Sequence, residues 1–189
     1  MHVRKCENIQ KNRITIDIFN NQLIISRDSM WKLKSILSGI ILGASLFVIF
    51  PKIAIYINEF FRLPIFRNIV YQIAGLSLCL VSVSLFICSS HLFSKIGKGT
   101  PAPIEPPKEL VAEGIYRFTR NPIYIGYILA IFGEFLIFGH FFLLIYAVGG
   151  IFFVHFYVVY IEEPNLKKRF GDQYARYMKT VPRWFLKNL

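Results

Sequence analysis

Residues 122–161 read PIYIGYILAIFGEFLIFGHFFLLIYAVGGIFFVHFYVVYI and contain a single acid, Glu134, with no lysine or arginine. The pair Gly139–His140 divides this stretch into two apolar runs, and so short a connection suits only a helical hairpin. About 20 mostly apolar residues are enough for a helix to cross a bilayer. The stretch therefore predicts two membrane helices, Pro122–Phe138 and His140–Ile161. The first is short for a crossing, which tilt or local thinning of the bilayer can absorb.

Two earlier apolar runs, Leu33–Ile57 and Ile69–Phe93, predict two further spans. Pro51 and Lys52 interrupt the first of them, so we expect this span to end early or to kink. The mean hydropathy is +0.48, 54% of the residues are hydrophobic, and the apolar residues are bunched into long runs, which is typical of membrane proteins. We therefore predict an all-α, polytopic membrane bundle with about four transmembrane helices.

The net charge of +11 fits a membrane protein better than a nucleic-acid-binding protein, for which we find no motif. Most lysines and arginines lie in the N-terminal tail, the connection Lys95–Arg120 and the C-terminal tail, and none lies at Gly139–His140. The positive-inside rule then places both termini and the central connection in the cytoplasm, which requires an even number of spans. The loop Lys52–Arg67 is mildly basic and runs slightly against this assignment. Neither the three cysteines nor the histidines have the spacing of a metal site, so we predict no metal.

The chain divides into a polar, basic tail at residues 1–34 and a membrane domain at residues 35–189. Within the tail, Arg13–Ser26 has the pattern of a short hairpin, and a disordered or membrane-surface tail fits its composition about as well. The central loop Gly97–Tyr116 is rich in proline, which excludes a regular helix and favours extended segments. We expect this loop to fold back on the protein rather than to be a flexible linker.

The segment Arg120-Asn-Pro122 has the features of a helix start at the membrane surface. Asparagine is a favoured N-cap residue, and proline suits the first helical position. The free amides of such a helix end, with Arg120 beside them, would bind an anion. An ordinary capped helix with a snorkelling arginine explains the segment equally well.

Gly126, Ala130 and Glu134 recur every four residues, which predicts a stripe of small residues for close helix packing. Glu134 should then face protein rather than lipid. An acid inside a membrane is a candidate for function, but a protonated, hydrogen-bonded structural role is the one we favour.

The acidic pair Glu162–Glu163 follows the last apolar run. Helical spacing places His155 and Val159 on the same face as Glu162. We expect Pro164 to break the helix directly after the pair, and an amphipathic helix to follow at Asn165–Lys179, in the plane of the membrane interface. Because the pair lies where the bilayer ends and a new helix turns, we expect it to have a role. The apolar stripe of the predicted interfacial helix consists of Leu166, Phe170, Tyr174 and Tyr177.

Four short motifs occur together in the C-terminal half of the chain: Arg120-Asn-Pro-x-Tyr124-x-Gly126, Glu162-Glu163-x-x-Leu166, Phe170-Gly171-x-x-Tyr174-x-x-Tyr177 and Val181-Pro182-Arg183. As a set they resemble the isoprenylcysteine carboxyl methyltransferase and phospholipid methyltransferase superfamily, over roughly residues 97–184. The resemblance implies a multi-span helical membrane enzyme that binds S-adenosylmethionine at the cytoplasmic interface. Many members have histidine where this chain has Asn121, so any acid–base role of that histidine is absent here.

The resemblance and the chemistry of methyl transfer assign roles to individual residues. Arg120 would hold a carboxylate acceptor, whereas an amine acceptor needs a base, for which Glu163 or Glu134 is the candidate. Arg120 and Glu163 are the predicted catalytic residues, and we expect both to reach water rather than to be structural. The predicted cofactor-binding residues are Tyr116, Arg120, Asn121, Tyr124, Gly126, His155, Glu162 and Glu163.

These expectations describe an S-adenosylmethionine-dependent methyltransferase of a lipid or lipid-attached acceptor, acting by carboxylate O-methylation or amine N-methylation. Membrane sterol and steroid reductases, which use NADPH, resemble the same region, but the Glu-Glu-x-x-Leu element favours the methyltransferase. A non-enzymatic membrane scaffold would explain the spans, but it would not explain why arginine, asparagine, glutamate and tyrosine cluster at one membrane face.

Overall fold

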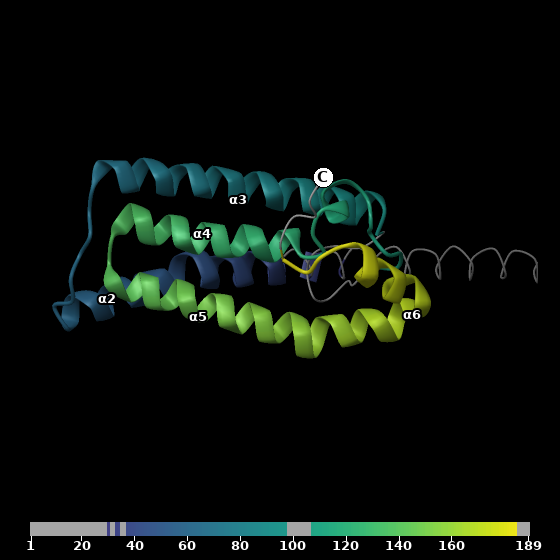
Figure 1. The fold of residues 1–189 in the computed structure, drawn as a ribbon. Helices are drawn as coiled ribbons and strands as arrows, with labels where there is room; N and C mark the ends of the chain where they lie inside the picture. Colours follow the sequence, from purple (N-terminus) through teal and green to yellow (C-terminus); the bar gives the residue numbers. More distant parts are fainter. Residues whose placement is uncertain (1–29, 31–32, 35–36, 98–106, 185–189) are drawn as a thin grey trace, which may run out of the picture.

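The computed structural model describes residues 30, 33–34, 37–97 and 107–184, which form a bundle of long antiparallel helices (Figure 1). The helical elements are Leu37–Phe60, which contains the π turn η1 (Ser45–Ile49) and α2 (Phe50–Phe60), then α3 (Ile69–Lys95), the 3₁₀ helix η2 (Gly114–Arg117), α4 (Pro122–Phe138), α5 (Phe141–Tyr157), the π turn η3 (Val158–Glu162) and α6 (Glu163–Thr180). The predicted all-α bundle is confirmed. The hairpin considered for the N-terminal tail and most of the central loop lie outside the described residues.

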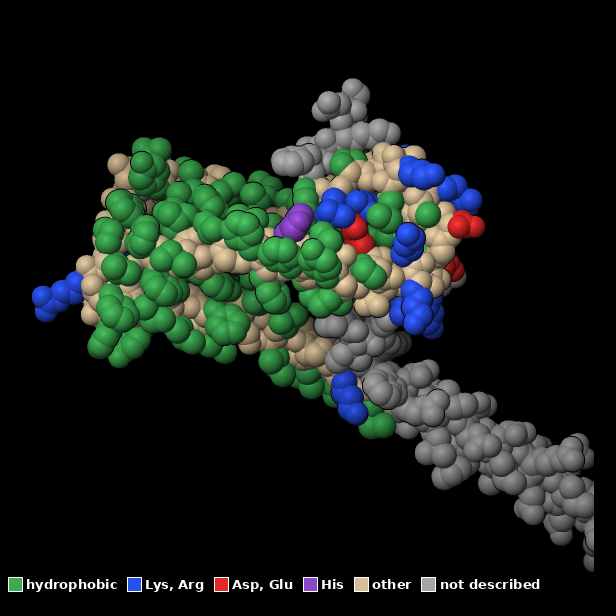
Figure 2. Space-filling view, turned by 60° about the horizontal axis from the view of Figure 1, so that its bottom comes forward, with side chains coloured by type: hydrophobic (Ala, Val, Ile, Leu, Met, Phe, Trp, Pro, Cys, Tyr) green, Lys and Arg blue, Asp and Glu red, His purple; other side chains and the backbone are tan. Residues whose placement is uncertain are grey.

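The surface of the bundle is that of a membrane protein. Leu37–Phe60, α3 and the helical segment Phe141–Thr180, which bends at Gly171, are long and apolar enough to cross a membrane, and α4 is a shorter apolar helix of 17 residues. Hydrophobic side chains cover the length of the bundle, and charged side chains gather mainly at one end (Figure 2). The protein is therefore an integral membrane protein, and its first two spans end only a few residues later than predicted.

The turn between α4 and α5 closes the end of the bundle opposite the charged one. Gly139 has a φ of 72°, which glycine adopts at little cost, and a Cβ there would lie 2.5 Å from the carbonyl oxygen of Phe66. The N–H of Phe66 donates to the Gly139 carbonyl at 2.7 Å, and the N–H of Phe142 donates to buried Asn58 at 2.9 Å. These bonds join the end of α2 and the α2–α3 loop to the hairpin, and the structure confirms the predicted turn at Gly139–His140.

Glycine residues allow α3 and α4 to approach closely. A Cβ on Gly75 would lie 2.6 Å from the carbonyl oxygen of Gly133, and a Cβ on Gly133 would lie 2.6 Å from Cys79 Sγ. Gly126 packs on the α3 backbone as well. The predicted stripe is thus correct in kind, but it runs through Gly133 rather than Glu134, because seven residues make almost two full turns of helix. Glu134 is half-buried beside the stripe.

Pro164 does not end the helix, so the predicted break there is wrong. The helix runs from Phe141 through the proline to Phe170 without a break, and η3 lies just before the proline. A π turn forms i→i+5 hydrogen bonds, which accommodates the missing proline N–H. The path changes direction at Gly171 instead, where φ is 51° and ψ is −127°, a conformation that glycine permits.

The C-terminal helix is present, but it begins at Glu163 rather than at Asn165, because the π turn carries the helix through the proline. Its apolar side packs on protein: Tyr174 and Tyr177 are buried, and Leu110 and Ala112 pack against them. The predicted apolar stripe therefore covers the connection that precedes α4.

Pro51 produces a π turn in the first span as well. In η1 the N–H of Phe50 donates to the carbonyl of Ser45, so the carbonyl of Leu46 would need the N–H of residue 51, which proline lacks. Tyr146 of α5 supplies a donor: its hydroxyl donates to the Leu46 carbonyl oxygen at 3.0 Å. The span does not end early at Pro51, as we considered, because the helix continues to Phe60 and the proline is accommodated by a π turn whose free carbonyl is bonded to α5.

Tyr146→Phe should remove this donor and leave the Leu46 carbonyl unpaired among apolar groups. We expect a loss of about 1 kcal/mol of stability, the scale of hydrogen bonds between membrane helices, measured as a lower thermal midpoint in detergent. Pro51→Ala restores a backbone N–H that can pair with the Leu46 carbonyl. The loss of stability caused by Tyr146→Phe should therefore be clearly smaller in a Pro51→Ala background. Equal costs in both backgrounds would contradict this account of the π turn.

Candidate active site

The charged end of the bundle is where α3 ends, α4 begins and α5 continues into α6 (Figure 1). Tyr116 lies in η2, Arg120 and Asn121 directly precede α4, and Glu162 and Glu163 lie at the junction of η3 and α6. The fold therefore brings the sequence motifs, which are far apart along the chain, to the same end of the molecule.

The segment that follows α6 is fastened to the start of α4. The backbone N–H of Arg120 donates to the Pro182 carbonyl at 3.0 Å. The Arg183 carbonyl accepts from the Thr119 hydroxyl at 3.0 Å and from the Asn121 side-chain amide at 3.1 Å. Asn121 is the N-cap residue by position, but its side chain makes no capping bond. The first amides of α4 are therefore left without a side-chain cap.

Glu163 is buried between two arginines, and we call the three side chains the Arg120–Glu163–Arg183 triad. Glu163 Oε1 lies 3.1 Å from Arg120 Nη1 and accepts from Arg183 Nε at 2.8 Å, while Oε2 accepts from Arg183 Nη2 at 2.8 Å. These hydrogen bonds to the carboxylate raise the pKa of Arg183. The side chains of Arg120 and Glu163 are 7% and 8% exposed. The expectation that both reach water is wrong, because the opposite charges pair in the interior.

The triad carries one net positive charge, since two guanidinium groups face one carboxylate. Arg120 also keeps donors for a further partner: its Nε and Nη1 are buried, and neither has a hydrogen-bond partner among the described residues. The contact between Nη1 and Glu163 is an ion pair without hydrogen-bond geometry. Arg120 can therefore still bind an anion.

The π turn η3 decides which acid of the pair faces inward. The buried positions of α5 and η3 are Leu143, Ala147, Gly150, Val154 and Val158. The next buried residue is Glu163, five positions after Val158, whereas an α-helical register would turn Glu162 inward. The extra residue of the π turn therefore delivers Glu163 to the arginines.

Glu162 has a different environment from Glu163. The Tyr124 hydroxyl donates to Glu162 Oε2, and the rings of Tyr124 and Tyr157 are 6.2 Å apart. Within the described part of the chain, no arginine or lysine pairs with Glu162. The carboxyl group of Glu162 thus lies beside tyrosine rings and forms no ion pair with the arginines.

Most of the predicted site residues come together, and Tyr116 joins them through the Tyr177 hydroxyl, which donates to the Tyr116 carbonyl at 2.6 Å. Gly126 does not, because it packs against α3. His155 is exposed, and its Nδ1 accepts from Trp184 Nε1 at 3.1 Å. We expected His155 and Glu162 to share one face of a regular α-helix. The π turn η3, which ends at Glu162, changes the helical register, so they do not share that face.

Arg183 is the site residue that sequence reasoning missed. It belongs to a recognised motif, but no local pattern shows that the segment after α6 returns to α4. Glu134, a candidate base, lies about three turns beyond the start of α4 and is therefore not part of this cluster. Its Oε2 is buried without a hydrogen-bond partner in the described ranges.

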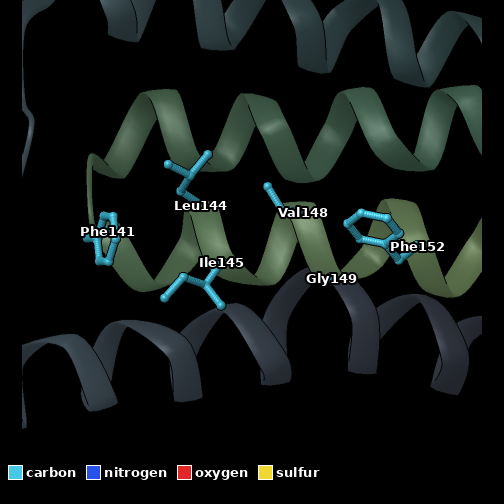
Figure 3. A pocket seen from close by; sticks show the side chains of 6 residues that line it. All are labelled: Phe141, Leu144, Ile145, Val148, Gly149 and Phe152. Atoms are coloured by element: carbon cyan, nitrogen blue, oxygen red, sulfur yellow. The ribbon is translucent and has the colours of Figure 1, made fainter.

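A groove of about 410 Å³ lies along α5, away from the triad, and is lined by Phe141, Leu144, Ile145, Val148, Gly149 and Phe152 (Figure 3). All of its lining residues are apolar or glycine, and they lie within a membrane span. Bilayer hydrocarbon matches such a lining. We therefore count the groove as part of the lipid-facing surface and not of the site.

Comparison with known families identifies the family of this chain. The chain matches the phospholipid methyltransferase family over residues 70–173, which run from the start of α3 into α6 and make up more than half of the chain. The protein therefore belongs to the phospholipid methyltransferase family, and it is a membrane methyltransferase that acts on lipids. No curated protein and no solved structure matches the chain.

Glu163→Gln should destabilise the protein as well as impair it. The variant keeps the shape of the side chain but leaves the buried guanidinium of Arg120 without a counter-charge. Breaking a buried pair in this way costs about 3–5 kcal/mol, so the thermal midpoint should fall and the residues after α6 should become sensitive to protease. Glu113→Gln, at an exposed acid of the same end, is the matched control. Unchanged stability in Glu163→Gln would show that the triad does not hold this end together.

Proposed function

We propose that the protein transfers a methyl group from S-adenosylmethionine to the amine of a membrane lipid, between the start of α4 and the junction of η3 and α6. The observation that carries the proposal is the position of Glu162, whose carboxyl group lies beside tyrosine rings and forms no ion pair with the arginines. Family membership supports a methyltransferase and gives no support to the NADPH-dependent reductase or the scaffold. We further propose that residues 97–184 hold the cofactor region, as the motifs suggest.

The chemistry of the site fits the methyl donor. Uncapped amides at the start of α4 and the unpartnered Nε and Nη1 of Arg120 would hold the carboxylate of the methionine moiety. The net charge of the triad matches one such carboxylate. When bound, S-adenosylmethionine supplies an electrophilic methyl group, and the protein mainly has to position the acceptor in line with it.

The charges of the site favour an amine acceptor over a carboxylate. A carboxylate acceptor would bring a second anion to a triad with one uncompensated positive charge. A lipid ammonium would instead find the carboxylate of Glu162 and the faces of Tyr124 and Tyr157, a combination that attracts cations. The ammonium must lose a proton before its nitrogen can attack, and in this proposal Glu162 accepts that proton. In this proposal Glu162 replaces Glu163 as the base, and Arg120 binds the donor.

A direct test compares ligands and a variant in lipid nanodiscs. Calorimetry should show binding of S-adenosylmethionine and none of NADPH, and a labelled methyl group should appear on an aminolipid. Glu162→Gln should bind the donor as the wild type does and lose at least ~1.4 kcal/mol of transition-state stabilisation, about tenfold in kcat/KM. Its residual rate should rise with pH, because the amine then loses its proton to water. Full activity in Glu162→Gln, or methylation of a carboxylate lipid only, would overturn this assignment.

We also propose that the charged end of the bundle and both termini face the cytoplasm. Positive charge is concentrated at cytoplasmic membrane faces. The exposed basic residues of the charged end include Lys95, Lys108, Arg117, Lys167, Lys168, Arg169, Arg176 and Lys179, whereas the α2–α3 loop at the opposite end has Arg62 and Arg67.

The orientation can be read by labelling single cysteines in a background without the native ones. An impermeant maleimide added to intact cells should label Arg62→Cys and leave Lys168→Cys unlabelled until the membrane is opened. Both positions are exposed, so each thiol can react once the reagent reaches its side. The reverse labelling pattern would show that the charged end faces the outside of the cell and would contradict the proposed orientation.

A further inference from the structure

Three hydroxyl groups near the candidate active site are buried without a partner. Ser89 Oγ, Ser90 Oγ and Tyr116 OH have no hydrogen-bond partner among the described residues. Ser89 is fully buried and Tyr116 is 5% exposed. A buried hydroxyl that forms no hydrogen bond costs roughly 1–3 kcal/mol, and such groups are rare in folded proteins.

Other serines of the membrane helices avoid this cost. The hydroxyls of Ser45, Ser77 and Ser84 donate to the carbonyl four residues earlier, at 2.8, 2.9 and 2.9 Å. Ser89 has the same option in α3 and does not take it. Its hydroxyl is therefore available for a partner outside the described chain.

The unpaired hydroxyls lie next to the proposed donor site. Ser82 of α3 packs beside Gly126 of α4, so Ser89, two turns further along α3, lies level with the residues that precede α4. The Tyr116 carbonyl receives the hydroxyl of Tyr177, which lies in α6. The hydroxyls of Ser89 and Tyr116, which we call the hydroxyl pair, thus border the site from the α3 side.

The environment of the hydroxyl pair selects a neutral ligand group. Burial raises the pKa of the Tyr116 phenol, and a weak contact with the Ser89 hydroxyl, which lacks full hydrogen-bond geometry, offsets part of the rise. Tyr177 and Glu162 add smaller increases to this pKa. Tyr116 therefore keeps its proton and can donate. The nearby Glu162 disfavours an anion such as phosphate. The ring of Phe93, 5.8 Å from that of Tyr116, adds an apolar wall.

We propose that Ser89 and Tyr116 bind the ribose hydroxyls of the adenosyl methyl donor. A sugar diol offers two groups that donate and accept, which matches two protein hydroxyls that do the same. Its carbon face is suited to the aromatic wall of Phe93. The assignment rests on the proposed function, because it requires an adenosyl donor in this site.

The test is a double-mutant cycle between the protein and the ligand. Calorimetry in nanodiscs compares S-adenosylhomocysteine with its 2′-deoxy and 3′-deoxy analogues. The wild type should prefer the full ribose by at least ~tenfold, as sites built to pair a ligand hydroxyl do. Ser89→Ala and Tyr116→Phe should each reduce that preference towards one. Ser84→Ala, which removes a back-bonded hydroxyl from the same helix, should retain it.

Thermal stability separates this role from a structural one. Without ligand, Ser89→Ala and Tyr116→Phe should unfold at or above the wild-type temperature, since each removes an unpaired buried hydroxyl. If both variants discriminate the analogues as the wild type does, or if the wild type binds all three ligands equally, the ribose assignment is overturned and the methyltransferase proposal stands. If the wild type binds no S-adenosylhomocysteine, both proposals fall.

Discussion

The carboxylate of Glu163 is the point at which the charged end of the molecule is held together. The segment before α4 reaches it through Arg120, the long helix Phe141–Thr180 carries it, and the residues after α6 reach it through Arg183. Apolar packing between spans cannot replace this contact. Lipid tails are as apolar as the helix surfaces, so apolar contacts alone do not favour one arrangement of the helices over another. The buried charges are tolerable only as a set, so the three segments form one polar unit.

Two π turns prepare the helices for these contacts, and each lies just before a proline. In a bilayer a carbonyl freed by proline must find a partner within the protein. At Pro51 that partner is Tyr146, which joins the first span to α5. At Pro164 the extra residue rotates the acidic pair, so that one acid faces the arginines and the other faces Tyr124. Adjacent glutamates therefore have different surroundings and can have different roles.

Local sequence patterns predicted what local physics controls. Hydropathy located the spans, and the glycine at residue 139 and the proline at residue 122 marked a turn and a helix start that the structure confirms. The patterns failed where the outcome depends on distant partners. The sequence near Arg120 does not indicate that its side chain pairs with Glu163, or that Arg183 binds the same carboxylate. The direction in which Glu162 points depends on the π turn η3, which an analysis of helical periodicity treats as regular α-helix. Gly171 bends the path within α6, and the tyrosines beyond it pack on Leu110 and Ala112, partners that the sequence of α6 does not show.

The length of α4 determines how deep the reactive end lies. Its 17 residues span about 25 Å, whereas the hydrocarbon layer is about 30 Å thick. If Gly139, which the α2–α3 loop holds, lies at the opposite surface of the hydrocarbon layer, the start of α4 would lie about 5 Å below the near surface. A leaflet that thins there would meet the start of α4, and the energy of that deformation would grow with the thickness of the host bilayer. A lipid in the thinned region would present its headgroup to the start of α4 while its tails stay in the leaflet, so we expect the rate of methyl transfer to depend on membrane thickness.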